Sequence, residues 1–183
     1  MGIVADRLKA LTVRVTSPDG NIQGLLNGRD MRIRFRPGTY HQYGEELLEH
    51  QLSRLFTLTA TGYRRGHGHI MSEVDLISIT DPADANSDAQ RRYLEAVPEL
   101  VVTGATTDGL VRIRCVGMRD WRCRIRPGTI AALEESQFVT ETETAIQSLL
   151  THYRREIMFL KDRCYNLQIP MVREARLAAE QSR

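Results

Sequence analysis

An internal repeat constrains this chain more than any other feature of its sequence. Residues 29–39 read RDMRIRFRPGT, and residues 119–129 read RDWRCRIRPGT. Eight of these eleven positions are identical, and the other three exchange one apolar residue for another. Upstream, Ser-Pro-Asp-Gly at 17–20 matches Thr-Thr-Asp-Gly at 106–109 with an offset of 89 instead of 90. The chain is therefore expected to contain one structural unit twice, with one residue inserted between the second and third strands of the second copy.

The first copy has the pattern of a three-stranded antiparallel meander. Residues 11–16 alternate and contain β-branched side chains, Pro-Asp-Gly at 18–20 supplies a turn, and residues 22–26 form the return strand. Asn27-Gly28 is a strong hairpin signal. Apolar residues then alternate with arginine over residues 31–36, and Pro37-Gly38 ends this third strand.

A long amphipathic helix is expected after the first meander, from about Glu45. Its apolar stripe recurs every three or four residues, at Leu48, Leu52 and Leu55. The sequence does not define its end, because Gly62, Gly66 and Gly68 weaken a helix, whereas Tyr63, Ile70 and Val74 could continue the stripe.

The second copy repeats this plan. Strands are expected at about 101–103, 111–116 and 121–125, and a helix from about Val139 until Pro170 closes it. The helices align at an offset of 94, at which Leu52, Leu55 and Phe56 match Ile146, Leu149 and Leu150.

These patterns predict an α+β fold of two tandem modules, each a three-stranded antiparallel β-meander plus a long helix. A single helix covers the apolar face of such a sheet poorly, so we expect the modules to cover each other about a pseudo-twofold axis, like a homodimer of a half-length ancestor. The expected parts are module 1 at 1–80, a linker with a short helix at 81–97, module 2 at 98–169 and a C-terminal tail helix at 170–183.

The third strand of each module is expected to have one apolar and one cationic face. Alternate residues of a strand point to the same side, about 7 Å apart, so the arginines form a row. The candidate binding residues belong to the two third strands and one neighbouring strand, and they are Arg32, Arg34, Arg36, Arg112, Arg114, Arg122, Arg124 and Arg126.

Two interpretations of these arginines stay open. One is a surface for phosphates or for an acidic partner. The other is a solvated sheet face balanced by nearby carboxylates, such as Glu134, Glu135, Glu141 and Glu143. The net charge is only +2, and the aromatic residues of these strands, Phe35 and Trp121, are expected on the apolar face and not beside the arginines. Nucleic-acid binding would therefore involve the backbone and no reading of base sequence.

The order strand, Ser/Thr-x-Asp-Gly turn, strand, short turn, strand, Pro-Gly and long helix resembles the YbaB/EbfC family. Residues 106–112, Thr-Thr-Asp-Gly-Leu-Val-Arg, are the closest local match. The chain is especially similar to divergent actinobacterial members, some of which belong to ESX (type VII) secretion loci. The family's long N-terminal helix would be reduced here to about residues 3–11, and its single unit occurs twice.

The resemblance implies a YbaB-like dimer within one chain and a nucleoid-associated protein that binds double-stranded DNA. The alternative that it implies is a protein-interaction or chaperone-like accessory of an ESX secretion system, with an acidic protein partner. A homodimer is left open.

The sequence offers no catalytic site. It has no G-x-S-x-G, P-loop or dinucleotide-binding motif, so we expect a non-enzymatic protein without a cofactor. His67 and His69 would share one face of an extended segment, but two imidazoles without a third ligand rarely form a metal site, and we favour a solvated loop. Asp19 and Asp108 occupy turn positions, and Trp121 faces the core, so structural roles are expected for all three.

Cysteine usage and hydropathy predict a reduced, cytoplasmic protein with no membrane partner. The three cysteines, Cys115, Cys123 and Cys164, form no C-x-x-C pair. Cys115 and Cys123 could face each other across a hairpin, although two small core residues is the preferred interpretation. No apolar stretch approaches the roughly 20 residues of a membrane helix, and the first residues do not read as a signal peptide.

Overall fold

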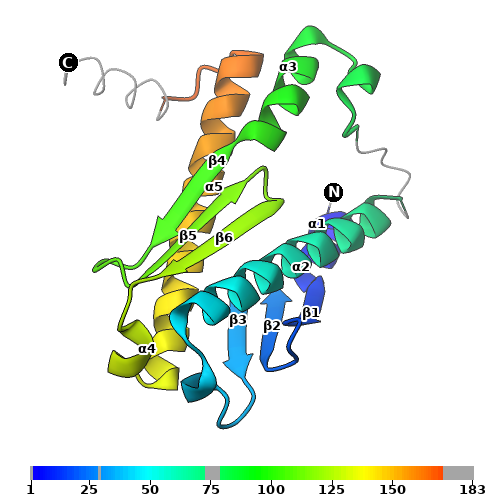
Figure 1. The fold of residues 1–183 in the computed structure, drawn as a ribbon. Coiled ribbons are helices and arrows are strands. Elements are labelled where there is room, and N and C mark those ends of the chain that lie inside the picture. Colours follow the sequence, from blue (N-terminus) through cyan, green and yellow to red (C-terminus); the bar gives the residue numbers. More distant parts are fainter. Residues whose placement is uncertain (1, 29, 73–78, 171–183) are drawn as a thin grey trace, which may run out of the picture.

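Figure 1 shows the computed structural model, which describes residues 2–28, 30–72 and 79–170. The chain has an α+β fold with two three-stranded antiparallel sheets, which confirms the fold class and the sheets expected from the sequence. Most of the expected tail helix, residues 171–183, lies outside the described residues, as does Val74. Within the described part, no helix is both long and apolar enough to cross a membrane.

The first sheet has the strand order β1-β2-β3, and in the chain it follows a short helix and precedes a long one. In chain order these elements are α1 (Gly2–Ala10), β1 (Thr12–Thr16), β2 (Ile22–Asn27), β3 (Asp30–Phe35), the 3-10 turn η1 (Tyr40–Gln42) and α2 (Glu45–Ser72). The second sheet has the order β4-β5-β6. Its elements are η2 (Pro82–Asp84), α3 (Asp88–Ala96), η3 (Val97–Glu99), β4 (Val101–Ala105), β5 (Val111–Val116), β6 (Asp120–Ile125), α4 (Thr129–Ala132) and α5 (Glu135–Tyr165).

Both Ser/Thr-x-Asp-Gly segments form the same turn between the first and second strands. The hydroxyls of Ser17 and Thr106 are buried and accept hydrogen bonds from the backbone N–H groups of Ile22 (2.9 Å) and Val111 (3.3 Å). The glycines that end the two segments have φ angles of 77° and 72°, which glycine adopts without strain. The motif therefore closes each hairpin and satisfies a buried backbone donor.

Both Arg-Pro-Gly-Thr segments end the third strand in the same way. The hydroxyl and the backbone N–H of Thr39 donate to the carbonyl of Arg36, at 2.8 and 3.1 Å. Thr129 donates twice to the carbonyl of Arg126, at 2.6 and 3.1 Å. The glycine in each turn has a positive φ, and proline cannot continue the ladder. The identical turns explain why these four residues are repeated without change.

The inserted residue lies where the change of offset predicts it. Asn27 pairs with Asp30, so two residues connect β2 and β3. Val116 pairs with Asp120, so three residues connect β5 and β6.

Each long helix contacts both sheets. Figure 1 shows α2 in front of the first sheet and the second sheet in front of α5. Hydrogen bonds described below place α2 beside β6 and α5 beside β3. One layer therefore consists of the second sheet and α2, and the other of α5 and the first sheet. Buried apolar side chains from both sheets and both helices form a single core cluster.

Glycine allows the close approach of helix and strand on both sides. A Cβ atom at Gly62 or Gly66 of α2 would lie 2.6 Å from a side-chain carbon of Val13 or Leu11. Two of the three glycines that left the end of this helix undefined in the sequence, Gly62 and Gly66, thus pack against the start of the first sheet, and α2 continues to Ser72. On the other side the glycine is in the strand, because a Cβ atom at Gly104 would lie 2.2 Å from the carbonyl oxygen of Ala145 in α5.

We expect Gly104→Ala to destabilise the protein by about 1–3 kcal/mol or more, because the added methyl group would meet helix backbone that cannot rotate away. Gly44→Ala is the matched control, since nothing lies within 4 Å of a Cβ atom there. Urea denaturation measures both changes. An equal effect of the two substitutions would contradict the close packing of α5 on β4.

The first turn also contains a carboxylate with a perturbed pKa. Asp19 accepts hydrogen bonds from the hydroxyls of Ser17 and Tyr43 and from the N–H of Asn21. Burial raises the pKa of this carboxyl, but the hydrogen bonds outweigh it and hold the pKa below the usual 3.8.

Because this pKa is lower in the folded state, the ionised Asp19 stabilises the protein above its unfolded-state pKa of about 4, and that contribution is lost as the pH falls through the folded-state value. We expect Asp19→Asn to destabilise the protein at neutral pH and to differ less from the unmodified chain in acid. Urea denaturation at neutral pH and at a pH of about 3 tests this. An unchanged difference between the two conditions would contradict the assignment.

Candidate functional site

The edge of β6 that faces away from β5 is covered by α2. Arg126 N–H bonds to Leu110 on the β5 side, so the N–H groups of Cys123 and Ile125 point outward. Cys123 N–H donates to the hydroxyl of Ser53, and Ile125 N–H donates to the carboxylate of Glu49, both at 2.8 Å. The two side chains replace the partner strand that this edge lacks.

Glu49 also forms an ion pair with Arg124, at 2.8 Å between Nη1 and Oε2. The Glu49 side chain is 13% exposed, whereas that of Arg124 is 76% exposed. One carboxylate therefore bonds to the backbone of the strand edge and to a side chain on the outer face at the same time.

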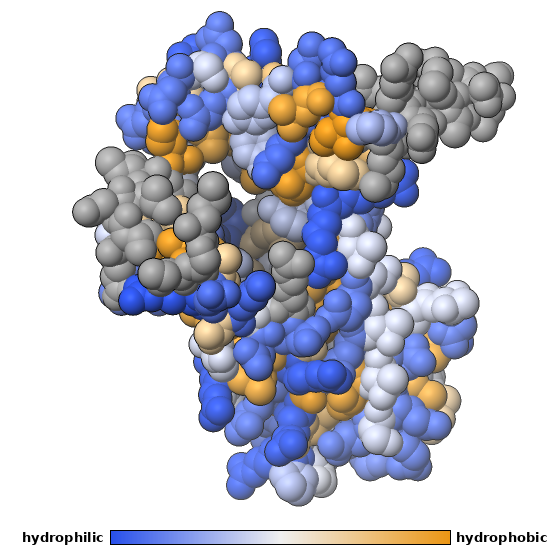
Figure 2. Space-filling view, turned by 180° about the vertical axis from the view of Figure 1, so that it is seen from behind, coloured by the Kyte–Doolittle hydropathy of each residue, from blue (hydrophilic) through white to orange (hydrophobic). Residues whose placement is uncertain are grey.

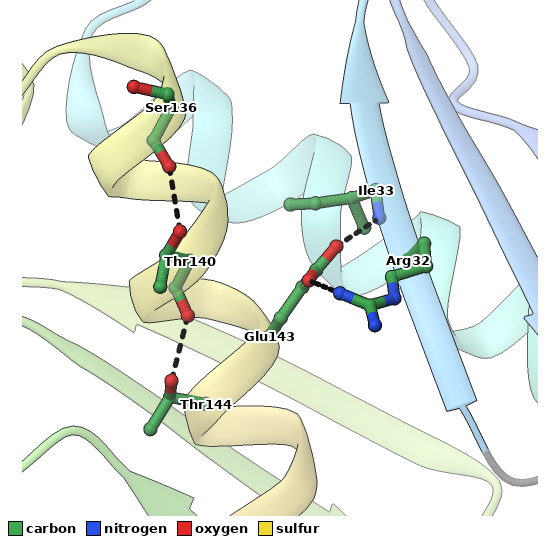
Figure 3. Close-up of polar contacts among 6 residues, drawn as sticks. All are labelled: Arg32, Ile33, Ser136, Thr140, Glu143 and Thr144. Carbon is green, nitrogen blue, oxygen red and sulfur yellow. Dashed lines mark hydrogen bonds and ion pairs between the residues drawn. The ribbon is translucent and has the colours of Figure 1, made fainter.

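The outward edge of β3 has the same type of contact with α5 (Figure 3). Glu143 accepts from Ile33 N–H at 3.1 Å and from Arg32 Nη1 at 2.8 Å, and its side chain is 16% exposed. On the same helix, the Thr140 and Thr144 hydroxyls donate to backbone carbonyls one turn earlier, at 3.0 and 2.8 Å. These hydroxyls bond within α5, whereas Glu143 bonds to β3.

All eight arginines predicted as site residues are exposed, and the apolar residues between them are buried. The two third strands alternate between exposed and buried side chains along their whole length, as does β5 up to Cys115. The prediction of one apolar and one cationic face is therefore confirmed. We call the set on the second sheet the second arginine face, and it consists of Arg112, Arg114, Arg122, Arg124 and Arg126.

The first arginine face contains a residue that the sequence interpretation missed. Arg14 is exposed on β1 and pairs with Leu25, which pairs in turn with Arg32, so the two arginines share a side of the sheet. The alternation Thr-Val-Arg-Val-Thr in β1 could have identified it. The face consists of Arg14, Arg32, Arg34 and Arg36. Figure 2 views the molecule from this side, where hydrophilic side chains (blue) surround smaller apolar areas (orange).

The second face is the denser of the two, because arginines lie directly opposite one another. The β5–β6 register pairs Arg112 with Arg124 and Arg114 with Arg122. Like charges in such positions are destabilising. On the first sheet, Leu25 and Gln23 lie opposite Arg32 and Arg34, so that face has no such pairs.

Acidic residues balance only part of the second face. Arg124 is paired with Glu49, and Arg122 lies 3.5 Å from Asp120. Arg126 donates to the backbone carbonyl of Asp108, which carries no charge. Among the residues that the structure describes, no acidic side chain lies within ion-pair distance of Arg112 or Arg114. The expected local balance is therefore present at Arg32 through Glu143, but Glu134, Glu135 and Glu141 form no ion pair with these arginines.

A groove of about 730 Å³ runs between α2 and β6 beside the second arginine face. Its lining combines carboxylates of α2 with arginines that the sequence interpretation did not single out, namely Arg54 and Arg119. Trp121 also borders it, as a buried residue that confirms the expected packing role. The groove extends the cationic surface of β6 toward α2 but adds acidic groups to it.

The solvated loop favoured for His67 and His69 is wrong, and the segment is not extended either. Both residues lie within α2, where side chains two positions apart point in different directions. The described residues contain no group of three or more His, Cys, Asp or Glu side chains placed to hold a metal ion.

The cysteines are core residues. Cys115 lies opposite Trp121 and Cys123 opposite Ile113, so the two cysteines do not face each other as the sequence had allowed. Both are buried, and burial raises the pKa of the Cys115 thiol to about 12 and that of Cys123 still further. Protonated, enclosed thiols are poor nucleophiles.

Comparisons of the chain with protein-family models, with curated proteins and with solved structures find no match.

We expect Glu49→Ala to destabilise the protein by about 1–3 kcal/mol, because it leaves a strand-edge N–H without its acceptor. Glu49→Gln keeps a carbonyl acceptor and loses only the ion pair with an exposed arginine, so it should cost less than about 1 kcal/mol. Glu46→Ala, an exposed site on the same helix, is the control. If chemical denaturation gives the same cost for Glu49→Ala and Glu46→Ala, the edge contact contributes nothing.

Proposed function

We propose that this chain binds the nucleic-acid backbone, without reading base sequence, through the arginines on the outer faces of its two sheets. The observation that carries the proposal is the second arginine face, where two pairs of arginines oppose each other and Arg112 and Arg114 have no acidic partner among the described residues. A face that repels itself gains free energy when phosphates neutralise it.

The geometry suits a row of phosphates. Arginines at alternate positions of β5 and β6 are about 7 Å apart along each strand and about 5 Å apart across the pair. Guanidinium groups are bidentate phosphate ligands that stay charged at any physiological pH. The aromatic residue of these two strands, Trp121, is buried on the opposite face from the arginines, which fits backbone contact and does not fit base stacking.

We also propose that the two halves of the chain are a fused pair related by a pseudo-twofold axis, as in a YbaB/EbfC-like dimer. The repeated turns, the same strand order and the two carboxylates that cover the edges of β3 and β6 support this. In such an arrangement the two arginine faces lie on opposite sides of the molecule. The role is non-enzymatic, needs no cofactor and takes place in the cytoplasm.

Not all eight arginines are equally free to bind phosphate. Arg32 forms an ion pair with Glu143, and Arg124 forms one with Glu49. Replacing either arginine would therefore disturb the contact between helix and strand as well as the charge of the face. Arg112 and Arg114 have no such role in the described structure, and they are the better residues to replace.

We expect the double variant Arg112→Gln/Arg114→Gln to bind a short DNA duplex about tenfold to a hundredfold more weakly near 0.1 M salt, and to flatten the slope of log affinity against log salt by about one to two units. Fluorescence polarisation over a salt series measures both quantities. The control is Arg65→Gln/Arg91→Gln, which removes equal charge from exposed helix positions. It should leave the slope nearly unchanged.

Two results would overturn the proposal. Binding that is tight but independent of salt and of Arg112 and Arg114 would exclude the mechanism. No binding at about 0.05 M salt would exclude the function. In the second case, co-purification of a defined acidic protein would favour the alternative role as a protein-interaction or ESX accessory protein.

A further inference from the structure

Three edges of the two sheets are covered by side chains from the long helices. Ser53 and Glu49 cover β6, and Glu143 covers β3. At the edge of β4 that faces away from β5, the backbone N and O atoms of Thr103 each lie 3.1 Å from the Nδ1 atom of His152 in α5. Unpaired strand edges are templates for another strand, and these side chains occupy them.

The outer edge of β1 differs from the other three. Ser17 N–H bonds to Ile22 and Gly28 N–H bonds to Leu11, so the backbone groups of Thr12, Arg14 and Thr16 point away from β2. Among the described residues, none forms a hydrogen bond with the outward backbone groups of this strand. Figure 1 shows β1 as the outermost strand of the first sheet.

The sequence explains the difference between β1 and β4. At the offset of 89 for the first strands, Arg14 corresponds to Thr103, and at the offset of 94 for the helices, Leu58 corresponds to His152. Leu58 cannot hydrogen bond to a strand, and it is 43% exposed. It lies within one turn of Leu55 and Gly62, which contact the first sheet. The helix therefore presents apolar surface where its counterpart presents an imidazole.

We propose that the outer edge of β1 is a docking site for an extended, acidic segment of a partner protein, which adds to the first sheet as a fourth strand. Every second side chain of that segment would lie on the outer face beside Arg14, and the side chains between them would lie toward Leu58. Arg14 lies on this outer face next to the added strand, so a carboxylate opposite it would form a cross-strand pair of opposite charge. Arg32, Arg34 and Arg36 belong to the same face but lie on or after β3, about 14 Å from the added strand, and contribute less. A segment that alternates acidic and apolar residues fits both sides.

A second copy of this chain fits the edge less well. The antiparallel register that would use Thr12, Arg14 and Thr16 of both copies places Arg14 directly opposite the Arg14 of the other copy. An acidic partner removes this repulsion. The proposal goes beyond nucleic-acid binding and does not depend on it, since it concerns the backbone of β1 and not the second arginine face.

The test uses a labelled, end-blocked peptide of alternating Glu and Val, titrated with the full chain. We expect saturable binding that falls about tenfold or more when the peptide is N-methylated at alternate residues, because N-methylation removes the strand hydrogen bonds and keeps the charges. The chain variant Thr16→Pro removes an outward N–H of the edge without breaking the β1–β2 ladder, and it should weaken binding to a similar degree. Hydrogen exchange should show new protection at Arg14 and Thr16.

Controls separate this proposal from nucleic-acid binding. Thr16→Pro changes no charge, so its affinity for duplex DNA should match that of the unmodified chain, and Arg112→Gln/Arg114→Gln should leave peptide affinity largely unchanged. Equal binding of the methylated and unmethylated peptides would overturn the proposal, because it would show attraction by charge alone. Absence of binding, or self-association that Thr16→Pro abolishes, would overturn it as well, and the second result would identify another copy as the occupant.

Discussion

The unpaired edge of each third strand is the constraint on which this fold depends. β3 and β6 end their sheets deep in the molecule, where backbone donors need partners. Each edge receives a carboxylate acceptor from the long helix of the other half. Glu143 of α5 accepts from β3, and Glu49 of α2 accepts from β6. These contacts fix α5 beside the first sheet and α2 beside the second. Each sheet therefore has one long helix on its core face and the other long helix at its inner edge. The two sheets have a single apolar core because each long helix contacts both of them.

The same arrangement determines where charge is exposed. With the core face of each sheet covered by helices, the opposite face meets solvent, and the alternation of each third strand brings arginine to it. The contacts at the edges use two of these arginines, Arg32 and Arg124, and leave Arg112 and Arg114 facing their neighbours across β5 and β6. A sheet designed only for stability would not place like charges opposite one another. The cost becomes understandable if an anionic ligand binds there.

Much of this could be predicted from sequence because the signals are local. Period-two alternation identified the strands and the outward arginines, and the shift of offset located the longer β5–β6 loop. The contact of each long helix with the edge of the other sheet could not be predicted, because Glu49 and Glu143 resemble any carboxylate on a helix surface. The continuation of α2 through Gly62 and Gly66 depends on contact with β1, and the same continuation placed His67 and His69 on a helix. The open edge of β1 becomes visible only when Leu58 is compared with His152.

Native-state hydrogen exchange tests the central claim most directly, namely that the two sheets share one core because each long helix contacts both of them. The free energies of opening for the slowest-exchanging amides of β2 and β5 should be equal and should match the global free energy of unfolding. They should also fall together when Glu49 is replaced by Ala. Two different values, with one sheet opening while the other stays protected, would show that the halves are independent units and would contradict this account.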